Sequence, residues 1–246
     1  MMRTLLAELR KIITLRSTYI ILGIMVALVL LFAGFIDGYR ATAASLASPD
    51  MLSGEVTSAV SVTSVLLALV GLLLFAHEYR YNLIMYTLTS TRSRSQVLLA
   101  KILAVTLFVV PMVLFVSALS PLAAYAGAHL RGLHMVHQTF NYWDLLWRNV
   151  FFAWAYAMFA LVFIALIRNQ IGAIIVFFIV PGTVEGILSL LLKGNAKYLP
   201  FTSLASVLKV GAPGSMSPGH SALVASAYLV VLWIFTWIMF LRRDAN

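Results

Sequence analysis

Residues 102–126 read ILAVTLFVVPMVLFVSALSPLAAYA, a stretch of 25 residues without a charged side chain. A helix needs about 20 predominantly apolar residues to cross the hydrocarbon core of a bilayer. Five further stretches are also long and apolar enough, and they cover residues 19–36, 60–76, 150–167, 171–192 and 222–241. Only helices and closed barrels satisfy their backbone hydrogen bonds in lipid, and continuous rather than alternating apolar runs indicate helices. The sequence therefore predicts an all-α integral membrane protein with six transmembrane helices.

The composition indicates a single membrane domain. Hydrophobic residues make up 62% and charged residues 10% of the 246 residues, and the mean hydropathy is +0.99. These values lie outside the range of soluble globular proteins. We therefore expect one transmembrane domain over residues 1–246. The lack of cysteine excludes disulfides, thiolate metal sites and S-palmitoylation.

The first apolar stretch follows a basic leader, which is also the pattern of a secretory signal peptide. The apolar core of a signal peptide has about 7 to 15 residues. Here the stretch 19–36 has 18 residues and is followed by Asp37 and Arg40. We therefore interpret it as a true membrane span.

Lysine and arginine are divided unequally between the two ends of the predicted spans. One side carries 11 of them: Arg3, Arg10, Lys11, Arg16, Arg80, Arg92, Arg94, Lys101, Arg168, Arg242 and Arg243. The other side carries 6: Arg40, Arg131, Arg148, Lys193, Lys197 and Lys209. Cytoplasmic flanks are the richer ones, and an even number of spans places both termini on the same side, so we predict that both are cytoplasmic. The net charge of +9 then belongs mainly to the cytoplasmic face and requires no nucleic-acid partner.

Residues 1–17 form an amphipathic leader. Its polar residues are Arg3, Glu8, Arg10 and Lys11, and the apolar residues that share one helical face are Leu5, Leu6, Leu9, Ile12 and Ile13. We expect a helix that lies in the membrane interface, with its apolar face in the acyl boundary and its basic face on anionic headgroups. A leader whose charges only keep the N-terminus inside is the alternative.

The segment 77–101 between the second and third spans carries the densest pattern of polar residues. Ser93 and Gln96 form a capping box, which predicts that a new helix begins near Arg94. Upstream, residues 83–88 are mostly apolar and are flanked by Arg80 and Arg92. Such a patch is typical of a short helix that docks into a partner protein. The alternative is that these residues extend the second helix or fold back on the bundle.

The order of elements resembles the ABC-2 family of ABC-transporter permeases over essentially the whole chain. In that family the first cytoplasmic loop commonly reads E-Y-R-x-G-T-I, followed by a Ser/Arg-rich turn and L-L-x-A-K. The residues that match are Glu78, Tyr79, Arg80, Ile84, Arg92, Ser93, Arg94, Leu98, Leu99, Ala100 and Lys101. Asn82 and Leu83 stand where the family usually has Gly and Thr.

The resemblance implies a non-catalytic subunit that pairs with a second permease copy or paralogue and with two copies of a cytoplasmic ATPase. ATP and Mg would be bound by the ATPase, and this chain would bind no cofactor. Residues 78–89 would form the coupling helix, with Glu78, Tyr79, Arg80, Leu83, Ile84, Arg92 and Arg94 as its coupling residues. Residues 1–17 would be the family's elbow helix. The expected function is export of an amphipathic or hydrophobic substrate, such as a peptide antibiotic, a drug or a lipid-like molecule, across a bacterial plasma membrane.

The residues themselves also point to an external source of energy. The sequence contains no G-x-x-x-x-G-K-[ST] phosphate-binding loop. Carriers driven by ions usually hold charged groups within their spans, and only Glu185 lies inside one of the predicted spans here. Pro181 is expected to end the fifth span near Val180, so that residues 184–192 turn back as a re-entrant or interfacial hairpin within an external hairpin and loop of residues 181–220. In that position Glu185 would line a substrate exit path. The alternative is a full span kinked at Pro181, in which Glu185 snorkels to the interface or caps a helix N-terminus near Thr183.

Enzymatic alternatives lack their motifs. The sequence has no H-E-x-x-H zinc motif and no G-x-S-x-G nucleophile elbow, so we predict no catalytic residues. His129, His134 and His137 match no standard metal-site spacing, and we predict no metal site. A membrane scaffold or assembly factor without transport activity is the alternative function.

Overall fold

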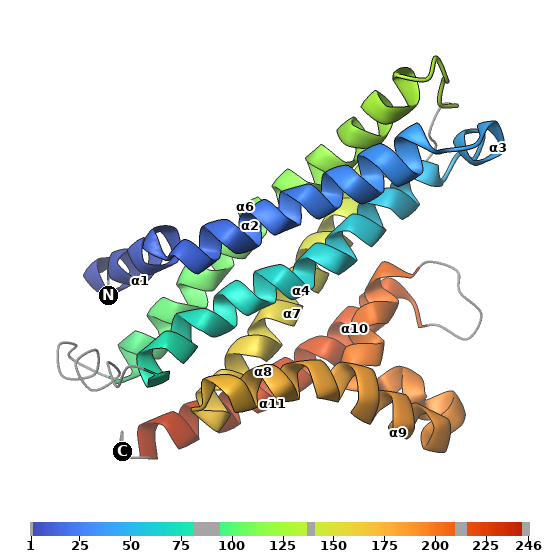
Figure 1. Cartoon of the computed structure of the whole chain (residues 1–246). Helices are drawn as coiled ribbons and strands as arrows, with labels where there is room; N and C mark the ends of the chain where they lie inside the picture. Colours follow the sequence, from blue (N-terminus) through green and yellow to red (C-terminus); the bar gives the residue numbers. More distant parts are fainter. Residues whose placement is uncertain (1, 81–93, 137–140, 210–215, 243–246) are drawn as a thin grey trace.

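The computed structural model describes residues 2–80, 94–136, 141–209 and 216–242 (Figure 1). Within these ranges the chain is helical and contains no strand. Its elements are α1 (Met2–Thr14), α2 (Arg16–Val29), η1 (Leu30–Tyr39), α3 (Ala43–Leu46), α4 (Met51–Arg80), α6 (Arg94–His129), α7 (Tyr142–Ile167), α8 (Gln170–Ile179), η2 (Val180–Val184), α9 (Glu185–Leu192), η3 (Lys193–Tyr198), α10 (Pro200–Leu208) and α11 (Pro218–Arg242). Of these, η1 and η2 are π-helical and η3 is a 3₁₀-helix.

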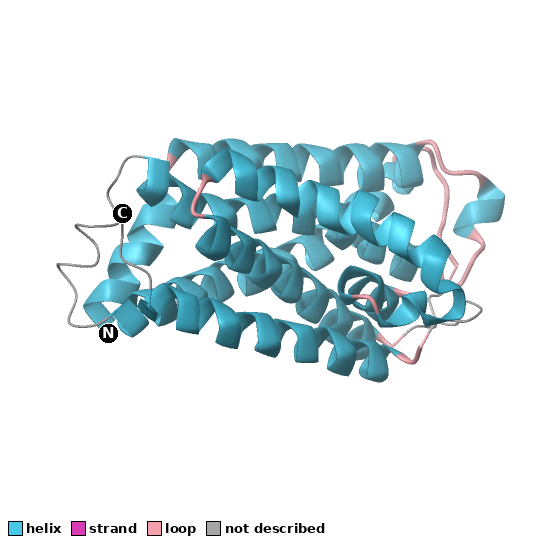
Figure 2. Ribbon diagram, turned by 90° about the horizontal axis from the view of Figure 1, so that it is seen from below, coloured by secondary structure: helices cyan, strands magenta, loops and turns pink. Residues whose placement is uncertain are grey.

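Six helical segments in the described ranges are long and apolar enough to cross a membrane. They are Arg16–Tyr39, Met51–Tyr79, Ser95–His129, Tyr142–Ile167, Gln170–Tyr198 and Pro218–Arg242. The prediction of an all-α, multi-pass membrane protein is therefore confirmed. Figure 2 shows the spans as one bundle with the two chain termini at the same end, and we call this the terminal end.

The second and fourth spans form the centre of the bundle. In their most apolar stretches 67% and 61% of the residues are buried, against 11% in the fifth span and 17% in the first. Small residues allow this close packing: Ala153, Ala157 and Ala160 of α7 are fully buried, and a Cβ on Gly71 of α4 would lie 3.2 Å from Val105 Cγ1. Close approach of small residues is the usual way in which helices pack in lipid.

The outer half of the first span lies directly against α6. A Cβ on Gly127 would overlap the carbonyl oxygen of Gly34, and a Cβ on Gly38 would lie 2.5 Å from the carbonyl oxygen of Ala124. Both positions therefore require glycine, because the two backbones are in contact there.

The fifth span does not follow the prediction. Its helix continues through Pro181 to Leu192, so the prediction that it ends near Val180 is wrong. Pro181 lies in the π-helical segment η2, and the wider turn accommodates the missing donor and the ring within the helix. The helix breaks instead at Lys193, whose φ is positive (48°); η3 then leads to Leu199, and Pro200 begins α10. The predicted segment 181–220 thus contains α9, η3 and α10, and α10 packs on α7 and α11.

Candidate functional site: a buried charge network

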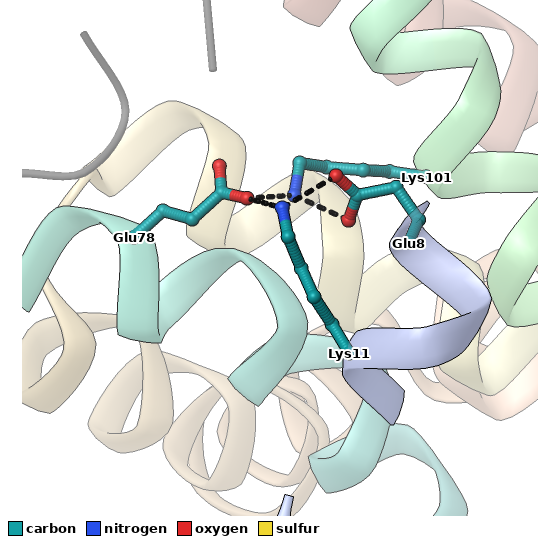
Figure 3. A network of polar contacts seen from close by, with 4 residues as sticks. All are labelled: Glu8, Lys11, Glu78 and Lys101. Carbon is teal, nitrogen blue, oxygen red and sulfur yellow. Dashed lines mark hydrogen bonds and ion pairs between the residues drawn. The ribbon is translucent and has the colours of Figure 1, made fainter. Parts of the chain in front are cut away.

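Four charged side chains meet at the terminal end, where α1 packs against α4 and α6. They are Glu8 and Lys11 of α1, Glu78 in the last turn of α4, and Lys101 in the second turn of α6 (Figure 3). Lys101 Nζ lies 2.9 Å from Glu8 Oε2 and 2.8 Å from Glu78 Oε1. Lys11 Nζ lies 2.7 Å from Glu8 Oε1 and 2.5 Å from Glu78 Oε1. Each ammonium group therefore binds both carboxylates.

Three of the four side chains in the network are buried from solvent. The side chains of Lys101, Glu8 and Glu78 are 0%, 1% and 5% exposed, whereas that of Lys11 is 38% exposed. Two positive and two negative charges cancel, which offsets much of the cost of taking them out of water. Lys101 Nζ also lies 4.6 Å from the centre of the Phe75 ring, a further favourable contact for a buried cation.

The electrostatic environment keeps Lys11 charged. Burial lowers the pKa of Lys11, but the carboxylates of Glu78 and Glu8 outweigh that effect, and the pKa is raised above its ordinary value. The ion pairs of Lys11 are therefore present at neutral pH. They would be lost only as the pH rises through this raised value.

The network corrects the predicted orientation of the leader. Glu8 was assigned to the polar face, but it is buried together with Ile12, and Leu5 and Leu9 pack against the core beside it. These four positions are spaced i, i+3, i+4 and i+7, so they share one helical face. Leu6 and Ile13, assigned to the same face as Leu9, are instead about half exposed. The prediction failed for Glu8 because it treated every charged residue as solvent-facing.

The predicted coupling residues fall partly inside the described ranges. Glu78 and Tyr79 belong to the last turn of α4 and are buried or half-buried. Arg80 ends α4 and Arg94 begins α6, although their side chains are not described. Residues 78–80 therefore belong to the second helix, whereas the apolar residues 83–88 lie outside the described residues. α6 is helical from Arg94, the first residue described after residue 80; Ser93 of the capping box lies outside the described residues, so the predicted helix start stays a prediction.

Three of the predicted coupling residues lie outside the described residues. They are Leu83, Ile84 and Arg92. Glu78 precedes residues 81–93 and Lys101 follows them, and the two side chains are bound to each other. The helices on either side of the segment are therefore held together.

Glu185 is buried, but its carboxylate binds another part of the chain. Oε1 accepts a hydrogen bond from the Phe201 amide at 2.7 Å. Oε2 accepts from the Thr202 amide at 2.7 Å and from the Thr202 hydroxyl at 2.9 Å. Glu185 thus caps the N-terminus of α10, a position that favours negative charge. The expectation of a cap near Thr183 located the wrong helix, whereas the exit-path role of Glu185 and Pro181 stays a prediction.

A second pair of acids lies toward the opposite end of the bundle. The side chains of Glu55 and Asp37 are neighbours, and both line a polar cavity of about 530 Å³ and a smaller, more apolar one of about 90 Å³. Two carboxyl groups in contact must share a proton or bind a cation. Both residues lie outside the apolar stretches 19–36 and 60–76 that the sequence predicted as spans, but they belong to the helical segments η1 and α4.

Two of the three histidines singled out in the sequence lie within the described residues. His129 ends α6, His134 follows it in a loop, and His137 lies outside the described residues. In the ranges that the structure describes, no group of three or more potential metal ligands is found.

The comparison with known families matches residues 20–245 to a family described as a protein of unknown function, DUF2705. The chain belongs to the DUF2705 family. No curated protein matches it. The part matched to DUF2705 includes Glu78 and Lys101, whereas Glu8 and Lys11 precede it. The family description assigns no activity, so the function of this DUF2705 chain must be argued from its geometry.

Proposed function

We propose that the chain is the transmembrane permease subunit of an ABC-2-type ABC transporter. It exports an amphipathic or hydrophobic substrate, and a separate cytoplasmic subunit hydrolyses the ATP. The observation that carries the proposal is the contact of 2.8 Å between Glu78 and Lys101. Glu78 belongs to the Glu-Tyr-Arg part of the motif and Lys101 to the Leu-Leu-Ala-Lys part, so the contact joins the two halves on which the resemblance rests.

This contact gives the segment between α4 and α6 a rigid base. Lys101 and Glu78 hold the two helix ends together, and Glu8 and Lys11 bind α1 to the same point. A displacement of residues 81–93 by a partner would therefore move three elements together. Because α4 packs along α7 at the centre of the bundle, the displacement would reach the core spans as a rigid-body motion.

The terminal end is proposed to be cytoplasmic. It carries the larger share of lysine and arginine, which favours that side. The outward side of α1 presents Arg3 and Arg10 next to the exposed Leu6 and Ile13, a combination suited to the lipid interface. This keeps the elbow-helix role for α1, with the bundle rather than the acyl boundary covering Glu8 and Ile12. The membrane is proposed to be a bacterial plasma membrane.

The complete transporter is proposed to contain two ATPase copies and a second permease copy or paralogue. The first and fifth spans are the least buried, so they have most surface left for lipid or for that second permease. We assign Glu185 to the folding of α10 rather than to the exit path, because both of its oxygens already accept hydrogen bonds.

The test is affinity purification of the tagged chain from native membranes in mild detergent, followed by mass spectrometry. We expect a near-stoichiometric partner that contains a phosphate-binding loop. Repeated recovery of the chain without any ATPase would overturn the proposal and favour the scaffold alternative.

Reconstitution of the purified complex supplies the second test. Vesicles containing the complex should move an amphipathic fluorescent solute only when ATP and Mg are present, and a variant of the ATPase without its phosphate-binding lysine is the control. A complex that hydrolyses ATP but moves no member of a broad solute panel would contradict the exporter assignment.

A further inference from the structure

A second polar site at the terminal end lies where the fourth span turns into the fifth. α7 ends at Ile167 and α8 begins at Gln170, so only Arg168 and Asn169 connect the two helices. Arg168 adopts the left-handed conformation (φ 56°) that lets the chain turn so tightly. Figure 1 shows this connection at the same end of the bundle as the two termini.

The turn encloses a cavity of about 330 Å³. Its lining consists of Tyr79, Arg168, Asn169, Gln170 and Ile171. Tyr79 comes from the end of α4, so the cavity lies between the second span and the connection of the fourth and fifth. Two side-chain atoms here, the Tyr79 hydroxyl and Gln170 Oε1, are buried without a hydrogen-bond partner in the described structure. Buried polar atoms of this kind normally bind water or a ligand.

The groups around the cavity favour an anion. The Arg168 guanidinium supplies a permanent positive charge with several donors, and the Tyr79 hydroxyl supplies another donor. Asn169 Oδ1 accepts a hydrogen bond from the Gly172 amide. The amides of Gln170 and Ile171, which come before Gly172 in α8, have no intrahelical acceptor. The neighbouring acid, Glu78, is already neutralised by Lys101 and Lys11.

The surface beside the cavity fits an acyl chain. Ile171, Ile175 and Phe178 are 71%, 49% and 50% exposed. Their spacing of i, i+4 and i+7 places them on one face of α8, which leads away from Arg168 along the span. A ligand with a phosphate in the cavity and a hydrocarbon tail on this face matches both surfaces, whereas a free phosphate would use only the first.

We propose that this cavity binds the phosphate of an anionic phospholipid, whose acyl chain lies along the face formed by Ile171, Ile175 and Phe178. Basic pockets between membrane spans bind anionic headgroups in the same way. The proposal needs only that the chain spans a membrane, so it stands or fails independently of the assignment as an ABC-2 permease.

The test compares lipids retained by the purified, full-length chain. Protein in mild detergent is equilibrated with equal amounts of phosphatidylglycerol and phosphatidylcholine, and bound lipid is counted by native mass spectrometry. We expect the wild type to prefer phosphatidylglycerol. Arg168→Asn, chosen because asparagine tolerates the left-handed conformation, should reduce that preference about tenfold through loss of a charged hydrogen-bond donor.

Two variants and one competitor complete the experiment. Arg168→Lys should keep most of the preference, because it keeps the charge, and Arg10→Asn, which removes an exposed charge from α1 at the same end, should leave it unchanged. Equal retention of both lipids by the wild type, or equal losses in Arg168→Asn and Arg10→Asn, would overturn the proposal. Displacement of the lipid by millimolar inorganic phosphate would also overturn it, because it would identify a site for a soluble anion.

Discussion

Lys101 Nζ and Glu78 Oε1 lie 2.8 Å apart, and this buried contact ties the start of α6 to the end of α4. Glu8 joins the same ammonium group at 2.9 Å, so the pairing includes the N-terminal helix. The three elements at the terminal end are thus held by charge rather than by apolar packing alone. The described helix ends on either side of residues 81–93 therefore depend on a buried charge network.

Replacement of Lys101 by methionine should destabilise the fold strongly. The change leaves two buried carboxylates near each other with only Lys11 to neutralise them, and breaking a buried ion pair from one side costs about 3 to 5 kcal/mol. Lys11→Met is the matched variant: it also leaves the two carboxylates one charge short, but the Lys11 side chain is 38% exposed, so solvent reaches that side of the network and the loss should be smaller. Thermal unfolding in detergent measures both, and equal losses would show that burial of Lys101 is unimportant.

Replacement of Gly127 by alanine should weaken the contact between η1 and α6. The added Cβ would overlap the Gly34 carbonyl oxygen, and overpacking of this kind costs about 1 to 3 kcal/mol. Gly23→Ala is the control, because no atom lies within 4 Å of a Cβ there, and alanine is the better helix former. Equal unfolding temperatures for the two variants would show that the backbones at Gly127 and Gly34 are not in close contact.

Substitutions of Glu185 distinguish a structural role of this residue from a role in transport. Glu185→Leu leaves the amides of Phe201 and Thr202 without their charged acceptor and should cost about 3 kcal/mol. Glu185→Gln keeps one acceptor oxygen and should cost about 1 kcal/mol, while Ser189→Ala, one turn further along α9, should cost little. Unfolding temperature and transport should fall together across the series. A loss of transport in Glu185→Gln at unchanged stability would instead support the exit-path interpretation.

The membrane spans were predictable because their signal is local. Each consists of enough consecutive apolar residues to cross the hydrocarbon core, and no distant contact is needed to recognise it. The end of the fifth span was not predictable by the same reasoning. Pro181 normally breaks a helix, and only the structure shows that a π-helical turn absorbs it.

The charge network and the Glu185 cap depend on residues far apart in the sequence. Glu8 and Lys101 are 93 positions apart, so the pairing could not be read from the chain. The spacing of Glu8 among Leu5, Leu9 and Ile12 was nevertheless a usable signal of its burial. For Glu185 the signal was weaker: Leu199, which precedes α10, provides no side-chain cap, so the helix needed an acceptor from elsewhere.

The segment between α4 and α6 provides the most direct test of the proposed partner. Glutamate at Leu83 or Ile84 would place an unpaired charge in an apolar interface, a change that typically costs several kcal/mol of binding energy, about 2 to 5. We therefore expect recovery of the ATPase with the tagged chain to fall at least about tenfold, while the amount of chain in the membrane stays the same. Leu130→Glu is the control, because Leu130 is 79% exposed and follows the end of α6 that is far from Arg94. Undiminished recovery of the ATPase with both loop variants would sink the assignment of this segment as the coupling helix, whereas a selective loss would place the partner against the base formed by Glu78 and Lys101.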